Sequence, residues 1–365
     1  MDREALVELV ALAAIAGEHV LVVGPPGTGK SEAVRRVARA LGGRYFEYLL
    51  GRFTEPSELF GPVDLKKLRD GVVETRTEGM LPEAEIAFLD EVFLGSTAIL
   101  NTLLGILNER RFRRGQTEVE CPLRVCVGAT NNLPEEDALA AFGDRFLVHF
   151  FVDPLPDHQL EALLEGGWSR GAPPAPVGLV ELDRLSAIAQ AADLGPVRPA
   201  LAQALRTLKR EGITLSDRRT VKVQRLIAAT AALSGRTTPT EADLWPLVYA
   251  VPNKVGQEAA KEALKDLLGR AESAALAHAA EQASNSPAAR AARLVNVGLG
   301  IFAERPTDAA LLPGWRLKLE GVAKELDAGF EANQRPAELE ALRARIVAET
   351  QVQEAGAAWV ELQVS

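Results

Sequence analysis

Hydrophobic residues in the first 155 positions form two alternating patterns, short apolar runs and longer stretches with helical spacing. The apolar runs are rich in branched and aromatic residues, which is typical of buried strands. They cover 19–23, 44–50, 86–92, 123–130 and 146–152. Helical spacing covers 1–18, 31–43 and 96–112. Strands that alternate with helices predict a doubly wound α/β domain with a parallel sheet over residues 1–155.

From residue 156 onward the pattern predicts helices only. We expect helices at 157–167, 179–192, 198–212, 217–235 and 241–251, with a loop at 171–178. After Pro252 the chain becomes rich in alanine, glutamate and lysine, and 257–283 is a strong helical stretch. The expected organisation is an α/β domain over 1–155, a small helical domain over 156–252 and a helical C-terminal region over 253–365.

Composition indicates a globular protein with a sizeable core, because 47% of the 365 residues are hydrophobic and 25% are charged. No apolar run reaches the roughly 18 residues of a membrane-spanning helix, and the N-terminus lacks the basic start of a signal peptide. Cys121 and Cys126 are expected to be buried free thiols rather than a disulfide or a metal pair. These features predict a cytoplasmic protein without membrane insertion. The net charge of -9 argues weakly against nucleic acid as the main partner.

A glycine-rich loop directly after the first apolar run carries the clearest chemistry in the chain. It matches the pattern G-x-x-x-x-G-K-[ST] and opens a predicted helix, in the order Gly24, Pro25, Pro26, Gly27, Thr28, Gly29, Lys30 and Ser31. Backbone N–H groups of such a loop, and the positive end of the following helix, surround phosphate oxygens. We expect Lys30 to reach the β- and γ-phosphates of ATP and the Ser31 hydroxyl to bind Mg²⁺. The alternative is a glycine-rich turn that only resembles a P-loop.

Polar residues follow two further apolar runs. Asp90 and Glu91 lie at the end of the run at 86–92, where a strand beside the P-loop would place them near the nucleotide. Asp90 is expected to hold Mg²⁺, directly or through water, and Glu91 to orient and deprotonate the attacking water. Asn131 follows the run at 123–130 and can sit between the catalytic carboxylate and the γ-phosphate. A plain turn formed by the two adjacent asparagines is the alternative.

Two arginines are candidates for completing the site. Arg145 lies between a predicted helix and the next short strand, and Arg218 opens the predicted helix at 217–235. Taken alone, each would be an ordinary surface ion pair. Their positions relative to the strands distinguish them from other arginines, and the roles that we expect for them come from a family resemblance.

Taken in order, these features resemble an AAA+ ATPase. The motif segments are GPPGTGKS, FLDEV, ATNN and GDRF, followed by a helical domain that carries an arginine. Longer stretches are similar to the MoxR group and, within it, to the RavA-like branch. Spread over roughly residues 1–250, these stretches are GEHVLVVGPPGTGKS, FEYLLGRFTEPSELFGPV, LPEAEIAFLDEV, AILNTLLGILNERRFRRG, NNLPEEDALAAFGDRF and LSDRR.

The resemblance implies a P-loop AAA+ domain followed by a helical lid, and it implies roles for single residues. Asn131 corresponds to the sensor-1 residue, Arg145 to the arginine finger offered to a neighbouring subunit's ATP, and Arg218 to the sensor-2 residue, with Arg219 as the alternative. Members form hexameric rings and act as chaperone-like motors on protein clients, often with a partner that bears a von Willebrand factor A domain. Residues just before the first helix contact adenine in such domains, and Asp2–Glu4 resembles the end of that segment.

Two basic segments leave other functions open. In the insertion at 61–79, expected near a ring pore, Lys66, Lys67 and Arg69 would either grip an acidic substrate or form a solvated face. The four arginines of Arg110–Arg114 resemble a nucleic-acid hairpin, although a turn with solvent-facing charges near the subunit interface is favoured. The main hypothesis is an ATP-driven protein-remodelling motor. The alternatives are a nucleic-acid motor that uses this hairpin and a nucleotide-gated scaffold.

Overall fold

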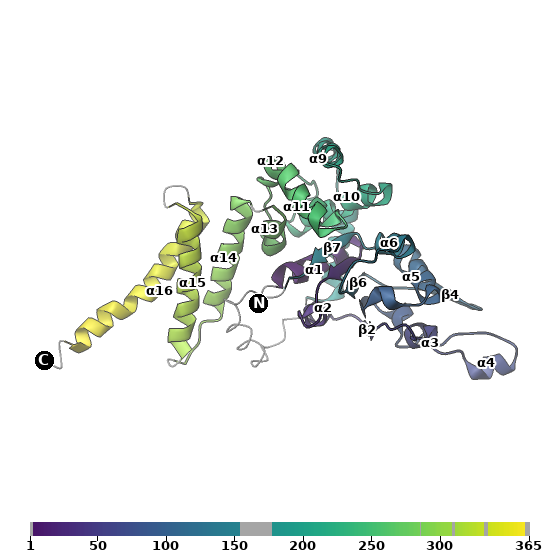
Figure 1. Cartoon of the computed structure of the whole chain (residues 1–365). Coiled ribbons are helices and arrows are strands. Elements are labelled where there is room, and N and C mark those ends of the chain that lie inside the picture. Colours follow the sequence, from purple (N-terminus) through teal and green to yellow (C-terminus); the bar gives the residue numbers. More distant parts are fainter. Residues whose placement is uncertain (1–2, 154–176, 285, 309–310, 332–334, 362–365) are drawn as a thin grey trace.

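A parallel sheet of five strands lies at the centre of the N-terminal α/β domain (Figure 1). The computed structural model describes residues 3–153, 177–284, 286–308, 311–331 and 335–361. The strand order is β2-β3-β6-β1-β7, with bounds β1 (Val20–Val23), β2 (Tyr45–Leu49), β3 (Ile86–Asp90), β6 (Val125–Thr130) and β7 (Val148–Phe151). Each strand lies within an apolar run expected from the sequence, so the predicted doubly wound α/β fold is confirmed.

The two faces of the sheet bury alternate residues of the same strands, as the two-residue period of a strand requires. On one face, Val20 joins a core with α1 (Glu4–Ala16) and α2 (Lys30–Leu41). On the other face, Leu21 joins a second core with α5 (Thr97–Glu109). Helices therefore cover both faces, and only the two ends of the strands are left for a site.

Short elements connect the layers on the α5 side of the sheet. They are α3 (Pro56–Phe60), α4 (Leu65–Arg69), the 3-10 turns η1 (Leu81–Glu83) and η2 (Val92–Leu94), the hairpin strands β4 (Arg111–Arg114) and β5 (Thr117–Glu120), and α6 (Asp137–Gly143). Val63 and Thr75 form an isolated antiparallel bridge. This bridge gives the insertion at 61–79 a hairpin-like shape, with the exposed helix α4 near its tip.

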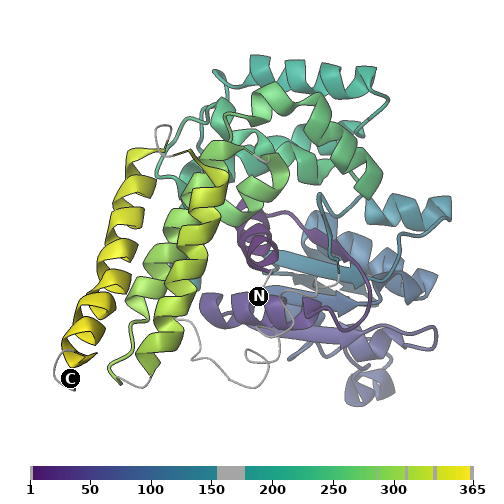
Figure 2. The same cartoon turned by 60° about the vertical axis from the view of Figure 1, so that its left-hand side comes forward.

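A layer of helices covers the α1 face of the sheet (Figures 1 and 2). Its first members are α8 (Leu179–Gln190), α9 (Arg198–Arg210), α10 (Asp217–Leu233), and the 3-10 turns η4 (Glu241–Asp243) and η5 (Trp245–Ala250). The predicted helices at 179–192, 198–212 and 217–235 are confirmed, whereas 241–251 forms 3-10 turns. The expected helix at 157–167, most of the expected loop at 171–178 and the boundary at 155–156 lie outside the described residues.

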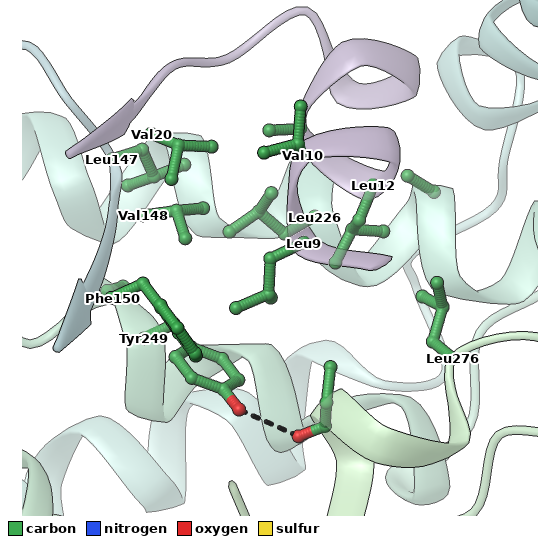
Figure 3. Packing of buried hydrophobic residues seen from close by; sticks show 14 of the residues in the cluster. Leu9, Val10, Leu12, Val20, Leu147, Val148, Phe150, Leu226, Tyr249 and Leu276 are labelled. Atoms are coloured by element: carbon green, nitrogen blue, oxygen red, sulfur yellow. Dashed lines mark hydrogen bonds between the residues drawn. The ribbon is translucent and has the colours of Figure 1, made fainter. Parts of the chain in front are cut away.

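Helix α1 supplies the core that the sheet and this helical layer share. Leu9 of α1, Phe150 of β7 and Leu226 of α10 belong to one buried cluster, which Figure 3 shows from close by. Fully burying a leucine stabilises a fold by about 1.5–3 kcal/mol. At the edge of the cluster, the Tyr249 hydroxyl donates a hydrogen bond of 2.8 Å to the Ala279 carbonyl. The helical layer is thus anchored to the sheet through α1.

The C-terminal part of this layer corrects one expectation. In place of a single helix at 257–283, the chain forms α11 (Lys254–Ala263), α12 (Lys265–Leu268) and α13 (Ala277–Ser284). The connecting residues Ala271 and Leu276 are buried in the shared core. Glu8 of α1 then caps the start of α13, because its carboxylate accepts a hydrogen bond of 2.7 Å from the Ala279 N–H. These tertiary contacts override the helical preference of the sequence.

Three long helices pack side by side as a bundle at the C-terminal side (Figure 2). They are α14 (Pro287–Ala303), α15 (Leu312–Gly329) and α16 (Ala337–Glu361). A Cβ on Gly298 of α14 would lie 2.6 Å from a methyl carbon of Leu342, so this glycine allows α16 to approach closely. The bundle has its own core, whereas the core shared by the sheet and the helical layer continues to Ala289. We propose a packing boundary near residue 286 rather than at 252.

Cys121 and Cys126 are buried free thiols, as the sequence predicts. Burial raises the pKa of the Cys121 thiol to about 11 and that of Cys126 to about 12, so both stay protonated at neutral pH.

In the described part of the chain, no helix combines the length and the apolar character needed to cross a membrane.

His278 makes the contact between α1 and α13 sensitive to pH. Its Nδ1 atom lies 2.7 Å from Oε1 of Glu8. Burial lowers the pKa of His278, but the hydrogen bond and charge of Glu8 outweigh burial, Glu4 adds to them, Arg293 opposes them, and the pKa is raised above its ordinary value. A raised pKa in the folded state means that protonation of His278 stabilises the fold.

We therefore expect the stabilisation from His278 to be complete below about pH 6.5 and to disappear as the pH rises through the raised pKa. The expected loss is on the order of 1 kcal/mol, the scale of one charged hydrogen bond. Urea unfolding at about pH 5.5 and about pH 8.5 would measure it in the wild type and in His278→Gln. An equal pH-dependent change in both proteins would show that this pair contributes nothing.

Candidate functional site

Three strand ends meet where the predicted nucleotide-contacting residues lie. Because β1, β6 and β3 are neighbours in a parallel sheet, their carboxyl ends share one edge. The P-loop follows β1, Asp90 ends β3 with Glu91 after it, and Asn131 follows β6. The structure thus brings Lys30, Asp90, Glu91 and Asn131 together at this edge, which we call the carboxyl edge.

The P-loop is tied closely to the ends of the neighbouring strands. The Gly24 N–H donates to the Thr130 carbonyl at 3.1 Å. A Cβ added to Gly24 would lie 2.4 Å from the Val152 carbonyl oxygen, so only glycine fits this close approach. Gly27 and Gly29 both have φ of +76°, in the left-handed region that glycine adopts readily. The backbone of the loop is therefore shaped by its glycines.

The start of α2 fits a phosphate group. Its N-cap residue is Gly29, and no described side chain caps the first N–H groups. Uncapped N–H groups and the positive end of the helix dipole together favour an anion. Pro25, Pro26 and Gly27 are exposed, so the loop is open to a ligand. Ser31, the second residue of α2, is half-buried beside these groups.

Lys30 is buried under the loop, where its ammonium group is fixed by backbone oxygens. Its Nζ donates to the Gly24 carbonyl at 2.7 Å and to the Pro25 carbonyl at 3.0 Å. Burial lowers the pKa of Lys30, while the charges of Asp90 and Glu91 oppose that shift. A cation within the electrostatic influence of two carboxylates is the arrangement expected around a nucleotide with a divalent metal ion.

Glu91 has a backbone conformation that is unusual for a residue with a side chain. Its φ is +50°, in the left-handed region, which costs energy for residues other than glycine. The Glu91 N–H donates to Asp90 Oδ1 at 3.0 Å, and Asn131 Nδ2 donates to Glu91 Oε1 at 2.5 Å. Carboxylates suit Mg²⁺, and the contact to Asn131 places an amide directly against the predicted base.

Arg3 also lies at this edge, although no catalytic role was expected for it. Its Nε donates to the Thr28 carbonyl at 2.9 Å, and its Nη2 donates to the Asp153 carbonyl at 3.0 Å. The charge of Arg3 also contributes to lowering the pKa of Lys30. No motif marks this position, and its resemblance to the end of an adenine-contacting segment was the one available signal.

The two predicted arginines lie at the other end of the strands. Val148, the first residue of β7, pairs with Val20, the first residue of β1. Arg145 precedes β7 and therefore lies at the edge opposite the P-loop, which we call the amino edge. Arg218 lies there too, because its Nη1 is 3.6 Å from Asp144 Oδ2. The structure does not bring these arginines to the chain's own P-loop.

Arg219 has no donor left for a nucleotide. An arginine side chain has five N–H donors, and here all five have acceptors within the chain. The acceptors are the Asp144 carboxylate, the carbonyl oxygens of Phe146, Leu147 and Ala250, and His149 Nε2. Burial lowers the pKa of His149 to about 3, so the imidazole is neutral and can accept this bond. Arg219 does not fit the alternative sensor-2 role.

The β4–β5 hairpin is not an uncompensated basic surface. A solvent-facing charge was expected at Arg110, but this residue is half-buried and donates to the Gly17 carbonyl at 2.7 Å. Arg111 and Arg113 are exposed, but both approach Glu118, at 3.7 Å and 3.0 Å. Pairing with a carboxylate reduces the field that would attract phosphates. This geometry does not favour a nucleic-acid motor.

The chain matches two family models. Residues 1–187 match the model described as the MoxR domain in the MoxR-vWA-beta-propeller ternary systems, and residues 195–263 match an AAA lid domain. The two matches cover the sheet with its flanking helices and most of the helical layer above α1. The part of that layer at residues 195–263 is therefore an AAA lid domain.

Relatives and solved structures agree with the family models. Two uncharacterized proteins of Methanocaldococcus jannaschii are each 36% identical over 245 residues, or 67% of this chain, which spans 66% and 64% of their lengths. Chaperone MoxR1 of Mycobacterium tuberculosis is 27% identical over 46% of this chain and 45% of its own length. A crystal structure from Cytophaga hutchinsonii, described as a candidate ATPase, shares the fold, with a TM-score of 0.58, 15% identity and coverage of 75% of this chain and 91% of its own. The chain belongs to the MoxR family of AAA+ ATPases.

Proposed function

We propose that this protein is an ATP-hydrolysing motor whose nucleotide sites are completed between neighbouring subunits of a ring. The observation that carries the proposal is the separation of the two groups of residues. Lys30, Asp90 and Glu91 gather at the carboxyl edge, whereas Arg145 and Arg218 lie at the amino edge. Within a single chain, Arg145 and Arg218 therefore lie away from the nucleotide site at the carboxyl edge.

Within one subunit, the carboxyl-edge residues would bind ATP and prepare water for attack. Lys30 would exchange its contacts with backbone oxygens for the β- and γ-phosphates. Ser31 and Asp90 would hold Mg²⁺, which when bound neutralises charge on the phosphate oxygens. Glu91 would accept the proton of the attacking water, and Asn131 would orient Glu91 through the amide contact between them.

The arginines would act on the nucleotide of the next subunit. The guanidinium of Arg145 is not fully engaged, since its buried Nε has no hydrogen-bond partner among the described residues. An arginine finger stabilises the charge that develops on the transferred phosphoryl group. Contacts between unlike edges are heterologous and close into a ring when the rotation permits. We infer a hexamer, as in the family that the sequence resembles, with Arg218 as the lid arginine of the shared site.

The work of this motor would be chaperone-like remodelling or assembly of a protein client. One relative at 27% identity is named a chaperone, and the family model is described from ternary systems that contain a vWA component. We infer a partner with a von Willebrand factor A domain and a place in the RavA-like branch, which the stretches FEYLLGRF and LSDRR favour. Hydrolysis would change how neighbouring subunits are oriented and so change the shape of the ring.

Removal of the Lys30 ammonium should abolish nucleotide binding. Each charge-assisted hydrogen bond contributes about 1.5–3 kcal/mol, so losing two should weaken ATP binding by 100-fold or more, by this rough estimate. Isothermal titration of Lys30→Ala with ATP and Mg²⁺ measures the effect. Lys66→Ala, an exposed lysine in α4, serves as the control and should bind normally. Unchanged affinity in Lys30→Ala would contradict the assignment of the site.

Arg145→Ala should bind ATP almost as well as the wild type but hydrolyse it about 10³–10⁵-fold more slowly. Its own P-loop is intact, and the loss falls on the neighbour's site. Mixing Arg145→Ala with Lys30→Ala should restore part of the ATPase activity, because some interfaces then pair an intact P-loop with an intact arginine. Well-mixed rings that stay inactive would count against action in trans.

Glu91→Gln should bind ATP and Mg²⁺ but not turn them over, because the amide cannot accept the proton. The variant separates a motor from a nucleotide-gated scaffold. If the protein is a motor, Glu91→Gln should still bind the partner, which a pull-down measures. Remodelling of the client should stop, which a client assay measures. If the client's state still changes at the normal rate with hydrolysis blocked, the protein works as a scaffold.

A further inference from the structure

Arg145 and Arg218 come from different parts of the chain. Arg145 lies in the loop between α6 and β7, and Arg218 lies in the first turn of α10 in the lid. If both meet one phosphate chain, their relative position has to be fixed, because a displacement of about 1 Å at a reacting group can cost roughly 10²-fold in rate. The structure contains one side chain that ties the two segments together.

Arg219 donates hydrogen bonds to residues on both sides of Arg145. Its Nε donates to Asp144 Oδ1 at 2.7 Å, one residue before Arg145. Its Nη2 donates to the Phe146 carbonyl at 2.7 Å, one residue after Arg145, and its Nη1 donates to the Leu147 carbonyl at 2.9 Å. Arg219 itself directly follows Arg218, so the same side chain joins the loop of one arginine to the helix turn of the other.

Other contacts keep α10 in place at the amino edge. The Ser216 hydroxyl lies 3.2 Å from both oxygens of the Asp144 carboxylate and accepts from the Arg219 N–H. Further along α10, Lys222 pairs with the fully buried carboxylate of Glu18 at 2.6 Å. Glu18 lies just before β1, so α10 is attached to the sheet at two separate points.

We infer that Arg219 is a positioning residue that locks Arg145 and Arg218 into one rigid pair, so that both are presented together to the nucleotide of a neighbouring subunit. The inference rests on the proposed function, in which those two arginines act in trans. It also explains why an arginine lies at a fully buried position: a planar guanidinium can satisfy five separated acceptors at once, whereas a lysine has three donors on a single atom.

Arg219→Lys tests the inference, since it keeps the positive charge but loses the planar guanidinium with its five N–H donors. Arg236→Lys is the matched control, because Arg236 also binds a buried carboxylate in the lid, with two contacts of 2.7 Å to Asp243, and touches neither arginine segment. Thermal unfolding and sizing establish that each variant folds and assembles. ATP affinity, kcat and KM are then measured, together with the activity of rings mixed with Lys30→Ala subunits.

For Arg219→Lys we expect ATP affinity within about twofold of the wild type and a fall in kcat of about 10²-fold. Addition of Lys30→Ala subunits should restore activity, because they present an intact arginine pair to the variant's own P-loop. A kcat reduced no more than in the Arg236→Lys control overturns the inference. So does a loss of kcat that intact neighbours fail to rescue, since the defect then lies in the variant's own site.

A second variant decides the case if Arg219→Lys does not fold. Asp144→Asn keeps the size of the side chain and weakens its bonds to Arg219 and Ser216, and the same fall in kcat with rescue in mixed rings is expected. Normal turnover in a folded Asp144→Asn ring overturns the inference. The proposed function has its own test: if Arg145→Ala turns over normally, action in trans is wrong, whereas an inactive Arg145→Ala beside normal Arg219→Lys refutes only the positioning role.

Discussion

The burial of α1 between the sheet and the lid is the contact on which the rest of the structure depends. This helix contributes Leu6, Leu9 and Leu12, all fully buried, to a core that also contains the strands and the lid helices. Removing such side chains from water gives a favourable free energy that does not depend on direction, and this free energy holds the lid on one face of the sheet. Directional contacts, such as the hydrogen bonds of Arg219 and the ion pair of Glu18, can then determine its orientation.

The polarity of a parallel sheet explains why the functional groups divide between two edges. Loops that follow strands collect at one edge, where the P-loop, Glu91 and Asn131 meet, and loops that precede strands collect at the other, with Arg145. Within one chain the two groups therefore lie at opposite edges of the sheet. In the ring that we propose, each copy would supply what the next one lacks.

The sequence predicted the strands and the turn between β1 and α2 well because their signals are local. A buried parallel strand is an apolar run of limited length, and the P-loop is a contiguous pattern beside one. The interruption of the helix at 257–283 could not be predicted, since its cause is a carboxylate from α1, distant in the chain. Arg3 likewise acquires its contact with the P-loop through the tertiary fold alone.

The difference between local signals and tertiary contacts also applies to the neighbours Arg218 and Arg219. Both are arginines in the first turn of one helix, and nothing in the local sequence separates them. In the structure their exposures differ: the side chain of Arg218 is 39% exposed and that of Arg219 is 1% exposed. Which of two adjacent residues faces the core depends on how α10 is rotated against the sheet, and that rotation is set by packing over the whole lid.

The close contact at Gly24 affects how the sequences of relatives that have lost ATP binding should be interpreted. The space that a Cβ on Gly24 would need is occupied by the Val152 carbonyl oxygen, which is part of the protein and not of a ligand. Substitution there would push apart β1 and β7 whether or not a nucleotide is ever bound. A descendant that had lost ATP binding would therefore be free to change Lys30 and Ser31 while still requiring glycine at position 24. In such a chain, the first glycine of the motif would indicate only that the packing of the sheet is retained. The lysine and serine alone would indicate whether ATP binding is retained.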